Sequence, residues 1–271
     1  MLVIEAEKKK ADFWKELWAY RELIYFLSWK DLLVRYKQTV VGFVWHFLKP
    51  FLMLLTLTVV FGRLAHLGEG KSYPYVLLVI SGLLPWQFFS ATLSDCSESL
   101  TVNYQLITKI YFPRMILPLS TMFVSFVDFL ITLSLLCCII IYYGFVPPKQ
   151  IVLLPVYIGL LVVLSFGLGI WSAAVNVRYR DCRQLVPFGI QFGLYITPVG
   201  FSSSIVPEKW RLMYHLNPMV GIIDGFRWTI IGKEEVLYLP GQCVSVGVIA
   251  VVVYLGMKYY RKVENFFADI V

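Results

Sequence analysis

Six stretches of the chain are apolar almost without interruption, and polar segments separate them. These stretches are residues 40–62, 74–96, 115–143, 151–177, 185–204 and 242–257. At about 1.5 Å per residue, roughly 20 residues of α-helix cross the hydrocarbon core of a bilayer. A helix also satisfies its own backbone hydrogen bonds, as lipid requires. The pattern therefore predicts an all-α integral membrane protein with six transmembrane helices.

The polar segments divide the chain further. Residues 1–39 precede the first span, residues 40–257 hold the transmembrane domain, and residues 258–271 form a C-terminal tail. Between residues 13 and 36, apolar side chains recur at helical spacing opposite a charged face, which predicts an amphipathic helix. Its apolar stripe is Phe13, Leu17, Tyr20, Ile24 and Leu27, with an aromatic shoulder of Trp14, Trp18, Tyr25 and Trp29. We interpret it as lying in the membrane interface; packing on another protein domain is the alternative.

A second amphipathic segment lies between the second and third spans. Residues 103–114 predict a short helix, because Leu106, Ile107 and Ile110 recur at helical spacing before Pro113 ends the run. Apolar residues on an exposed helix need a partner. That partner is either another protein or the ends of the chain's own spans.

The segment before the last span is apolar but cannot cross a bilayer. Residues 205–232 contain an apolar part of about 14 residues, too short to span, and this part includes Asp224 and Arg227. Pro218 and Gly232 punctuate the segment. The sequence therefore predicts two short helices that form a re-entrant hairpin.

Composition and charge support this organisation. Hydrophobic residues make up 59% of the chain, charged residues make up 15%, and the mean hydropathy is +0.72. A soluble domain carries closer to about 25% charge. Basic residues concentrate before the first span, after the last, and in the connections after the second and fourth spans. By the positive-inside rule both termini are predicted to be cytoplasmic.

The sequence gives little support for catalysis, metal binding or nucleotide binding. The three histidines lie far apart, and the five cysteines show no metal-ligand spacing, so neither a catalytic nor a metal site is predicted. Residues 65–72 read AHLGEGKS, close to a phosphate-binding loop. That loop requires a preceding strand, whereas this one connects two predicted spans.

Two groups of residues inside the spans are candidates for function. Asp128 and Lys49 are charged, so each should face the bundle interior or a wet cavity. Each is either a proton-relay or substrate group or one half of a structural ion pair. Six aromatic residues also lie inside spans and either fill the core or line a channel for a sliding sugar chain: Trp45, Phe47, Phe51, Phe188, Phe192 and Tyr195.

Six short motifs occur along the chain in a fixed order. They are RYKQTVVGFVW from Arg35 with Lys49-Pro50, GLLPW from Gly82, KIYFPR from Lys109, RYRD from Arg178, TPV from Thr197, and HLNP from His215 followed by GFR from Gly225. Together they resemble the ABC-2 family of ABC-transporter permeases over nearly the whole chain. They look most like its polysaccharide-export branch, the Wzm-type O-antigen permeases.

This resemblance implies a function and a set of partners. The chain would be the permease subunit of a bacterial inner-membrane exporter of undecaprenyl-diphosphate-linked O-antigen or a related polysaccharide. It would pair with a second copy of itself and with two ABC ATPase subunits, which bind ATP and Mg, so no cofactor is expected in this chain and no nucleic-acid partner. Capsule or teichoic-acid export is the alternative within the family. A drug exporter, a membrane glycosyltransferase and a secondary transporter are further alternatives.

The resemblance also implies roles for particular residues. The helix at 103–114 would couple to the ATPase through Lys109, Tyr111, Phe112 and Arg114. Residues 205–232 would form outer gate helices with Asn217, Pro218, Asp224 and Arg227. The lipid diphosphate would meet basic residues at the inner headgroup level, namely Arg35, Lys37, Arg178 and Arg180.

Overall fold

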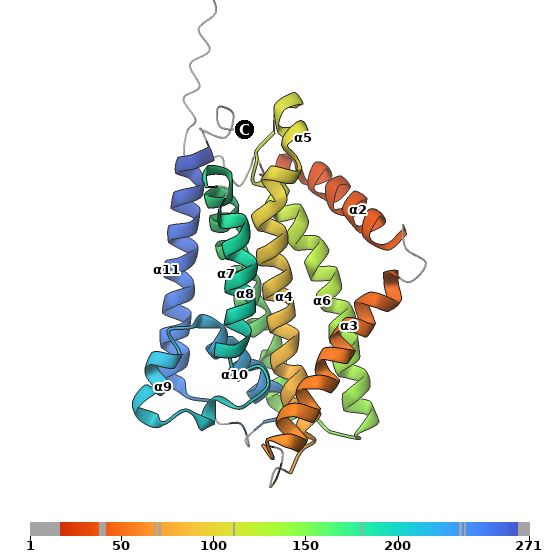
Figure 1. Cartoon of the computed structure of the whole chain (residues 1–271), viewed down its shortest axis with the longest axis vertical. Coiled ribbons are helices and arrows are strands. Elements are labelled where there is room, and N and C mark those ends of the chain that lie inside the picture. The colour runs from red at the N-terminus through yellow and green to blue at the C-terminus, as the bar shows by residue number, and fades with distance from the viewer. Residues whose placement is uncertain are drawn as a thin grey trace, which may run out of the picture.

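The elements of the protein are helices throughout the part of the chain that the structure describes. The computed structural model describes residues 17–37, 42–67, 69, 72–110, 112–179, 181–232, 235 and 237–264, without the side chains of 37 and 42–46. The long helices run side by side along one direction (Figure 1). This arrangement is the all-α membrane bundle that the sequence predicts.

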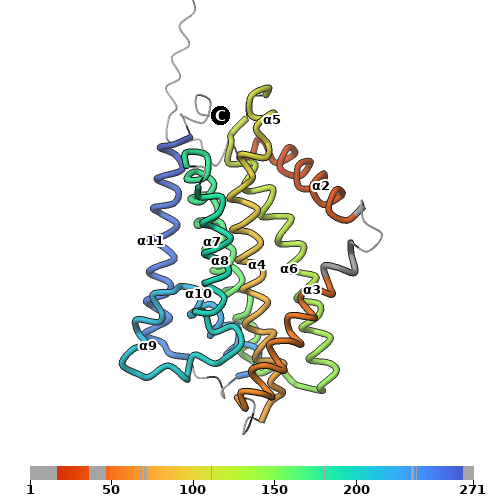
Figure 2. Tube along the Cα trace, viewed as in Figure 1, coloured from red at the N-terminus to blue at the C-terminus, as the bar shows by residue number. Residues whose placement is uncertain are grey.

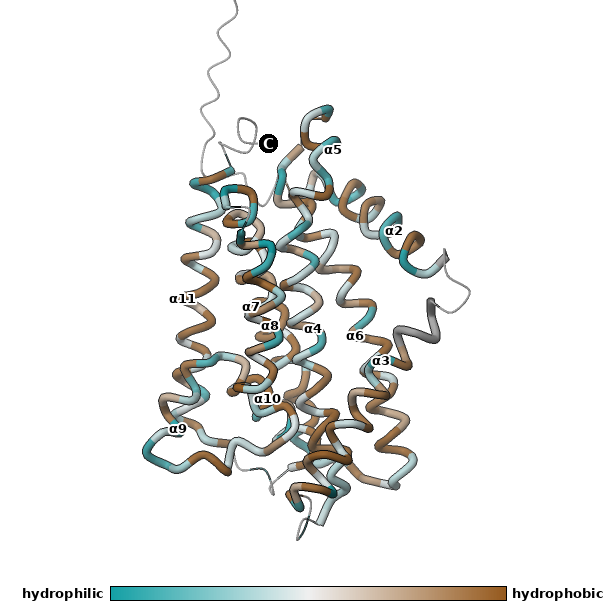
Figure 3. The backbone as a smooth tube through the Cα atoms, in the orientation of Figure 1, coloured by the Kyte–Doolittle hydropathy of each residue, from teal (hydrophilic) through white to brown (hydrophobic). Residues whose placement is uncertain are grey.

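Five helical segments are long and apolar enough to cross a membrane. They are α3 (Gly42–Leu57) with its π-helical continuation η1 (Thr58–Leu64), α4 (Tyr75–Val102), α6 (Ile116–Tyr142), α7 (Leu154–Arg178) with the preceding 3-10 turn η2 (Lys149–Leu153), and α11 (Leu239–Glu264). Apolar residues dominate these segments (Figure 3). They correspond to five of the six predicted spans.

The expected sixth span is a shorter helix. In place of the span expected at residues 185–204, the structure has α8 (Cys182–Ile196), whose 15 residues rise only about 22 Å. The chain from the end of α7 to the residues after α8 nevertheless runs along α4. Asn176 Nδ2, at the end of α7, donates to the Ser97 carbonyl at 2.7 Å, and the Val199 carbonyl lies against Gly82. These two points on α4 are also about 22 Å apart. Whether this passage is a complete span stays a prediction.

Helix α4 is the centre of the bundle. It packs against α6, α7, α8, α10 (Pro218–Ile230) and α3, and most of its residues are buried. Small residues bring the helices close: a Cβ on Gly169 of α7 would lie 2.9 Å from the Cys96 Cβ of α4. Burying apolar side chains inside the protein leaves fewer to contact lipid, so α4 is the most shielded of the five candidate spans.

The short helices gather at the two ends of the bundle. Helices α2 (Arg21–Lys37) and α5 (Tyr104–Lys109) lie at one end, and η3 (Ser203–Ile205), α9 (Glu208–Tyr214) and α10 lie at the other (Figures 1 and 2). The two predicted connecting segments are therefore on opposite sides of the bundle. The two segments lie at opposite ends because the long helices between them carry the chain from one end of the bundle to the other.

The apolar stripe of the N-terminal amphipathic helix packs on the bundle. Leu17, Ile24 and Leu27 are buried in a cluster with α4, α6, α7 and α11 of the same chain. The aromatic shoulder stays exposed, including Trp18 and Tyr25, whereas Phe13 and Trp14 lie outside the described residues. That the exposed shoulder lies in the membrane interface stays a prediction.

The segment before α11 has two short helices, α9 and α10. Pro207 precedes α9, and Asn217 caps α10 by accepting a hydrogen bond from the Met219 amide at 3.1 Å. Pro218 occupies the first turn of α10, where a missing N–H costs nothing. Gly232 ends the segment with φ of 97°. The role of these helices as a gate stays a prediction.

Candidate functional site

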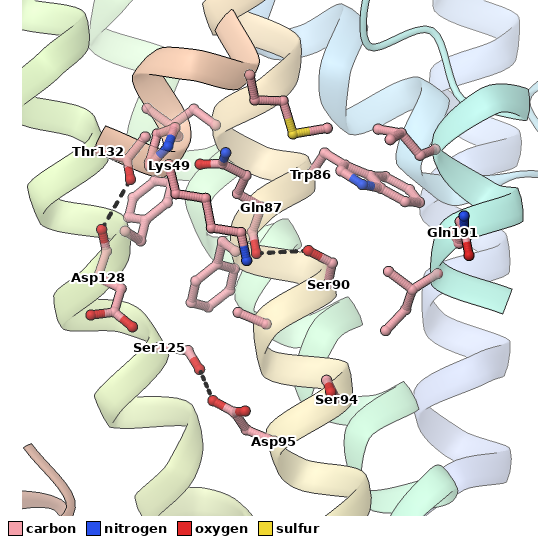
Figure 4. Close-up of a pocket in the computed structure, with 18 of the residues that line it drawn as sticks. Lys49, Trp86, Gln87, Ser90, Ser94, Asp95, Ser125, Asp128, Thr132 and Gln191 are labelled. Atoms are coloured by element: carbon pink, nitrogen blue, oxygen red, sulfur yellow. Dashed lines mark hydrogen bonds between the residues drawn. The ribbon is translucent and has the colours of Figure 1, made fainter. Parts of the chain in front are cut away.

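A cavity of about 930 Å³ lies between α3, α4, α6 and α8 (Figure 4). Polar side chains enter it from one face of each central helix: Gln87, Ser90, Ser94 and Asp95 from α4, and Ser125, Asp128 and Thr132 from α6. These spacings of three, four and seven residues place each set on a single helical stripe. Lys49 of α3 extends towards Gln87 and Ser90, and Gln191 of α8 approaches from the other side (Figure 4).

Apolar and aromatic side chains form the rest of the cavity wall. Trp86, Phe88 and Phe129 contribute aromatic rings, and Leu84 and Met53 contribute aliphatic surface. A mostly apolar cavity with a few convergent polar groups is typical of a binding site. Three of the four helices around it, α3, α4 and α6, are long and apolar enough to span a membrane, so the polar groups of the cavity are shielded from lipid.

A charge cluster forms one end of the cavity. Arg35 of α2 donates from Nη1 to Asp128 Oδ2 at 2.5 Å and from Nη2 to Asp95 Oδ2 at 2.9 Å. The Tyr36 hydroxyl donates to Asp128 Oδ1, and Ser125 Oγ donates to Asp95 Oδ2 at 3.3 Å. The cluster therefore ties α2 to both α4 and α6.

The cluster also affects proton affinity on α2. Burial lowers the pKa of Arg35, but the two carboxylates outweigh burial and leave the pKa raised. Burial and the Asp128 carboxylate both raise the pKa of Tyr36. Arg35 thus stays cationic and Tyr36 stays a neutral donor across the physiological range.

Two expectations about charges inside spans are met. Asp128 and Lys49 both line the cavity rather than facing lipid. Asp128 is part of an ion pair, although its partner is Arg35 from the N-terminal helix and not another residue within a span.

Sequence reasoning missed Asp95. It lies at the edge of the predicted second span, in the polar stripe that Gln87, Ser90 and Ser94 form along α4. A polar stripe along an otherwise apolar span is the signal that could have found it. The second carboxylate of the cluster could not be paired with Arg35 without the tertiary structure.

The residues predicted to bind a lipid diphosphate are placed differently from one another. Arg35 is held between two carboxylates. Arg178 is exposed at the end of α7, with its guanidinium carbon 5.4 Å from the ring centre of Tyr179. Arg180 and the side chain of Lys37 lie outside the described residues. Among the described side chains, only Arg35 and Arg178 belong to this set, so the shared diphosphate site stays a prediction.

The predicted channel aromatics lie beside the cavity rather than in its wall. Phe47 and Phe51 of α3 are exposed, as are the aromatic residues of α8, namely Phe188, Phe192 and Tyr195. The Phe188 and Phe192 rings stack with centres 6.1 Å apart and planes 6° apart. Neighbouring positions on α8, such as Pro187 and Gln191, line the cavity instead. The side chain of Trp45 lies outside the described residues.

The predicted coupling segment divides into exposed and buried parts. Tyr104, Lys109 and Ile110 are exposed at the end of the bundle. Phe112 is buried in the cluster that holds α2, and Arg114 donates to the Glu264 carbonyl of α11. Tyr111 lies outside the described residues. Part of the segment therefore packs on the chain's own spans, and another part stays available to a partner.

At the opposite end, Arg227 of α10 is fully buried. Its guanidinium donates to the backbone carbonyls of Phe201 at 2.8 Å, Pro198 at 2.6 Å and Val199 at 3.0 Å, and its Nε donates to Leu78 of α4 at 3.4 Å. Burial lowers the pKa of Arg227 while Asp224 and Glu235 oppose that shift. The residue fastens the loop after α8 to α4 and α10.

Asp224 completes this network one helical turn earlier. It accepts a hydrogen bond from Ser203 Oγ at 2.7 Å, and its Oδ2 lies 3.5 Å from Nε2 of the buried His215. Burial lowers the pKa of His215, but Asp224 and the Arg211 carbonyl leave it raised above the ordinary value. Asn217 also donates to Thr197 Oγ1 at 3.0 Å. Asp224 and Arg227 are thus buried among polar partners, whereas Asn217 and Pro218 are half-buried.

The fold and the cavity define a class of protein: a multi-pass helical membrane protein whose helices surround a mostly apolar cavity that a few polar side chains enter. Its sequence matches the family model described as ABC-2 type transporter over residues 22–231. The chain belongs to this family of transporter permeases.

Curated relatives resemble the chain over most of its length. An O-antigen export system permease protein of Klebsiella pneumoniae is 28% identical, with 92% of this chain and 95% of the relative covered. A protein of the same name from Myxococcus xanthus is 31% identical, with 79% and 82% covered. A polysialic acid transport protein of Escherichia coli is 23% identical, with 87% and 91% covered.

Proposed function

We propose that this chain is the membrane-spanning subunit of an ABC exporter that moves a lipid-linked polysaccharide of the O-antigen type out of the bacterial cytoplasm. The observation that carries the proposal is similarity to O-antigen export permeases over almost the whole chain. The intramembrane cavity supports it, because hydroxyl, amide and aromatic groups suit sugar rings. The undecaprenyl diphosphate carrier is part of the proposal.

In this proposal two copies of the chain work together with two ATPase subunits. The exposed aromatic stripe of α8, formed by Phe188, Phe192 and Tyr195, is available to a second copy or to the passing glycan. The exposed face around Tyr104, Lys109 and Ile110 is available to the ATPase. ATP and Mg bind to that partner, and its conformational cycle shifts the permease between channel states.

The orientation in the inner membrane follows the distribution of basic residues. Both termini and α5 lie on the cytoplasmic side, and α9 and α10 lie on the outer side as gate helices. A lipid diphosphate at the inner headgroup level meets Arg178, Arg180 and Lys37 there. Arg35 joins them by exchanging a carboxylate partner for phosphate, since both present paired oxygens to a guanidinium.

Capsule polysaccharide export is the second candidate. Similarity to a polysialic acid transport protein favours it, although the identity is lower, at 23%. The two candidates share the partner subunits and the direction of transport, and they differ in the glycan.

Transport into inverted membrane vesicles tests the proposal. The chain, assembled with its ATPase, should accumulate a polyprenyl-diphosphate-linked oligosaccharide in the lumen when ATP is added. Omitting ATP, or omitting the permease, is the control. Accumulation that is independent of both nucleotide and ATPase subunit would contradict the proposal.

A further inference from the structure

The charges that line the cavity cancel. Among the described residues, the charged side chains in its wall are Arg35 and Lys49, which are positive, and Asp95 and Asp128, which are negative. The sequence indicated Arg35, Lys49 and Asp128 as candidates for function. The tertiary structure adds Asp95 to the same space, so that the formal sum of the four charges is zero.

Arg35 can bind a further anion only by giving up one of its two carboxylate partners, so it adds no surplus positive charge to the cavity. Both terminal nitrogens of its guanidinium already donate to carboxylates, at 2.5 Å and 2.9 Å. Taken alone, the cluster of one guanidinium and two carboxylates carries a net charge of −1. Asp95 accepts from Arg35 and Ser125 through Oδ2, which leaves its Oδ1 as an acceptor for a ligand hydroxyl.

Lys49 is the remaining positive charge of the wall. Its side chain is exposed to the cavity beside Gln87 and Ser90 (Figure 4), and no ion pair holds it within the described chain. One ammonium group compensates at most one anionic group at a time. A glycan with an acid on every repeat brings more negative charge than this site neutralises.

Desolvation decides which glycan such a cavity accepts. An anionic group that leaves water for a mostly apolar space loses hydration worth several kcal/mol, and a surplus of positive charge must offset that loss. An uncharged sugar loses only hydroxyl hydration, which hydroxyl, amide and carboxylate side chains replace. Trp86 adds an aromatic ring to the same wall.

A second copy does not alter this balance. In a symmetric dimer each copy contributes the same residues, so the sum of the charges from both cavities is again zero. The conclusion therefore holds for one cavity or for a conduit formed by two.

We propose that this cavity takes uncharged, hydroxyl-rich sugar units and discriminates against polyanionic glycans, with Asp95 and Asp128 as the residues that determine this specificity. The inference rests on the proposed function as a glycan exporter and narrows the class of glycan. It favours a neutral O-antigen-type chain over an acidic capsule-type chain.

The test is binding of two matched probes to the permease in lipid nanodiscs. One probe is a short polyprenyl-diphosphate-linked oligosaccharide of neutral hexoses, and the other has the same length with hexuronic acids in place of hexoses. The lipid and diphosphate are identical, so the difference in Kd reports the sugar charge. The wild type should bind the neutral probe at least about tenfold more tightly, as expected for a difference near 1.4 kcal/mol.

Variants then shift the preference in opposite directions. The double variant Asp95→Asn with Asp128→Asn changes the lining charge from 0 to +2 and should reduce or invert the preference. Lys49→Gln changes it to −1 and should widen the preference. As a matched control, Asp181→Asn with Glu208→Gln removes two exposed carboxylates outside the cavity wall and should leave the ratio unchanged.

The outcomes separate this inference from the proposed function. If neither probe binds the wild type, the proposed function is wrong and the inference goes with it. Equal binding, or tighter binding of the acidic probe, overturns the charge discrimination while the export proposal stands. If the double variant does not fold, Lys49→Gln and Lys49→Glu still decide the matter, because Lys49 is in no ion pair that folding requires. An unchanged ratio in both lysine variants would overturn the inference.

Discussion

Arg227 illustrates how a single buried charge can organise backbone. Four backbone carbonyls accept hydrogen bonds from its guanidinium, and they come from α4 and from the loop after α8. Gly82 makes this geometry possible, since a Cβ there would lie 2.7 Å from the Val199 carbonyl and 2.8 Å from Arg227 Nη2. Because the planar guanidinium presents five donors in fixed directions, lysine cannot replace it.

We therefore expect Arg227→Lys to lower the stability of the permease. Its single ammonium leaves buried carbonyls without donors, at a cost of about 3 kcal/mol. Thermal unfolding in detergent measures the loss. Arg183→Lys, which changes an exposed arginine, is the control and should unfold like the wild type. An unchanged unfolding temperature for Arg227→Lys would contradict the structural role.

The His215–Asp224 pair makes stability depend on pH. The pKa of His215 is raised in the folded protein. Its pairing therefore contributes fully below the ordinary histidine pKa of about 6.5, and the contribution is lost as pH rises through the raised folded pKa. Asp224→Asn keeps an acceptor for Ser203 but removes the charge.

The unfolding temperature of the wild type should therefore fall as the pH rises. In Asp224→Asn this fall should be smaller. A pH series of thermal unfolding curves, from about pH 5.5 to 8.5, measures it around the ordinary histidine pKa. His66→Gln is the control, because His66 is exposed and pairs with Glu69 outside this network. If the pH dependence of the unfolding temperature persisted in Asp224→Asn and disappeared in His66→Gln, it would come from His66 and not from the His215–Asp224 pair.

At the scale of elements, α5 and the residues after it serve two purposes. Phe112 belongs to a buried cluster that includes Leu17 and Ile24 of the N-terminal region. Ile110 and Lys109, a few residues earlier, face outward. A helix of six residues gains little stability by itself, so its position depends on the buried anchor. Contact of its exposed side chains with the ATPase stays a prediction.

Two variants should separate these purposes. Tyr104→Ala with Ile110→Ala should reduce permease-dependent stimulation of ATP hydrolysis by about tenfold, a loss near 1.4 kcal/mol of coupling, with little change in stability. Phe112→Ala should lower stability by about 3 kcal/mol through the cavity it leaves. Thr108→Ala, on the same exposed helix, is the control. Normal coupling in the double variant would place the ATPase contact elsewhere.

On the scale of the whole molecule, the helices of the bundle differ in how far they are buried. Helix α4 is enclosed by its neighbours, whereas α8 has no buried residue. An exposed row of aromatic side chains beside the cavity needs either lipid or a second protein surface against it. In a twofold dimer the same row from each copy would meet or flank a shared conduit.

Cysteine cross-linking tests this arrangement. In a background without the native cysteines, Phe188→Cys, Phe192→Cys or Tyr195→Cys should give disulfide-linked dimers on mild oxidation in membranes. Val156→Cys, at an exposed position of α7, is the control and should stay monomeric. If none of the three α8 positions cross-links, the dimer contact lies on another face.

The membrane fold and most of its elements followed from the sequence, because apolar runs and their interruptions are local properties. The sequence also predicted other local features. These are the helix boundaries at Pro218 and Gly232 and the aromatic shoulder that contains Trp18. The sequence alone did not indicate which residue each charged side chain contacts. Only the tertiary structure brought Arg35 between Asp95 and Asp128, and Arg227 onto the loop after α8. Ion pairs join residues distant along the chain, and their choice depends on how helices pack, which a one-dimensional pattern does not specify.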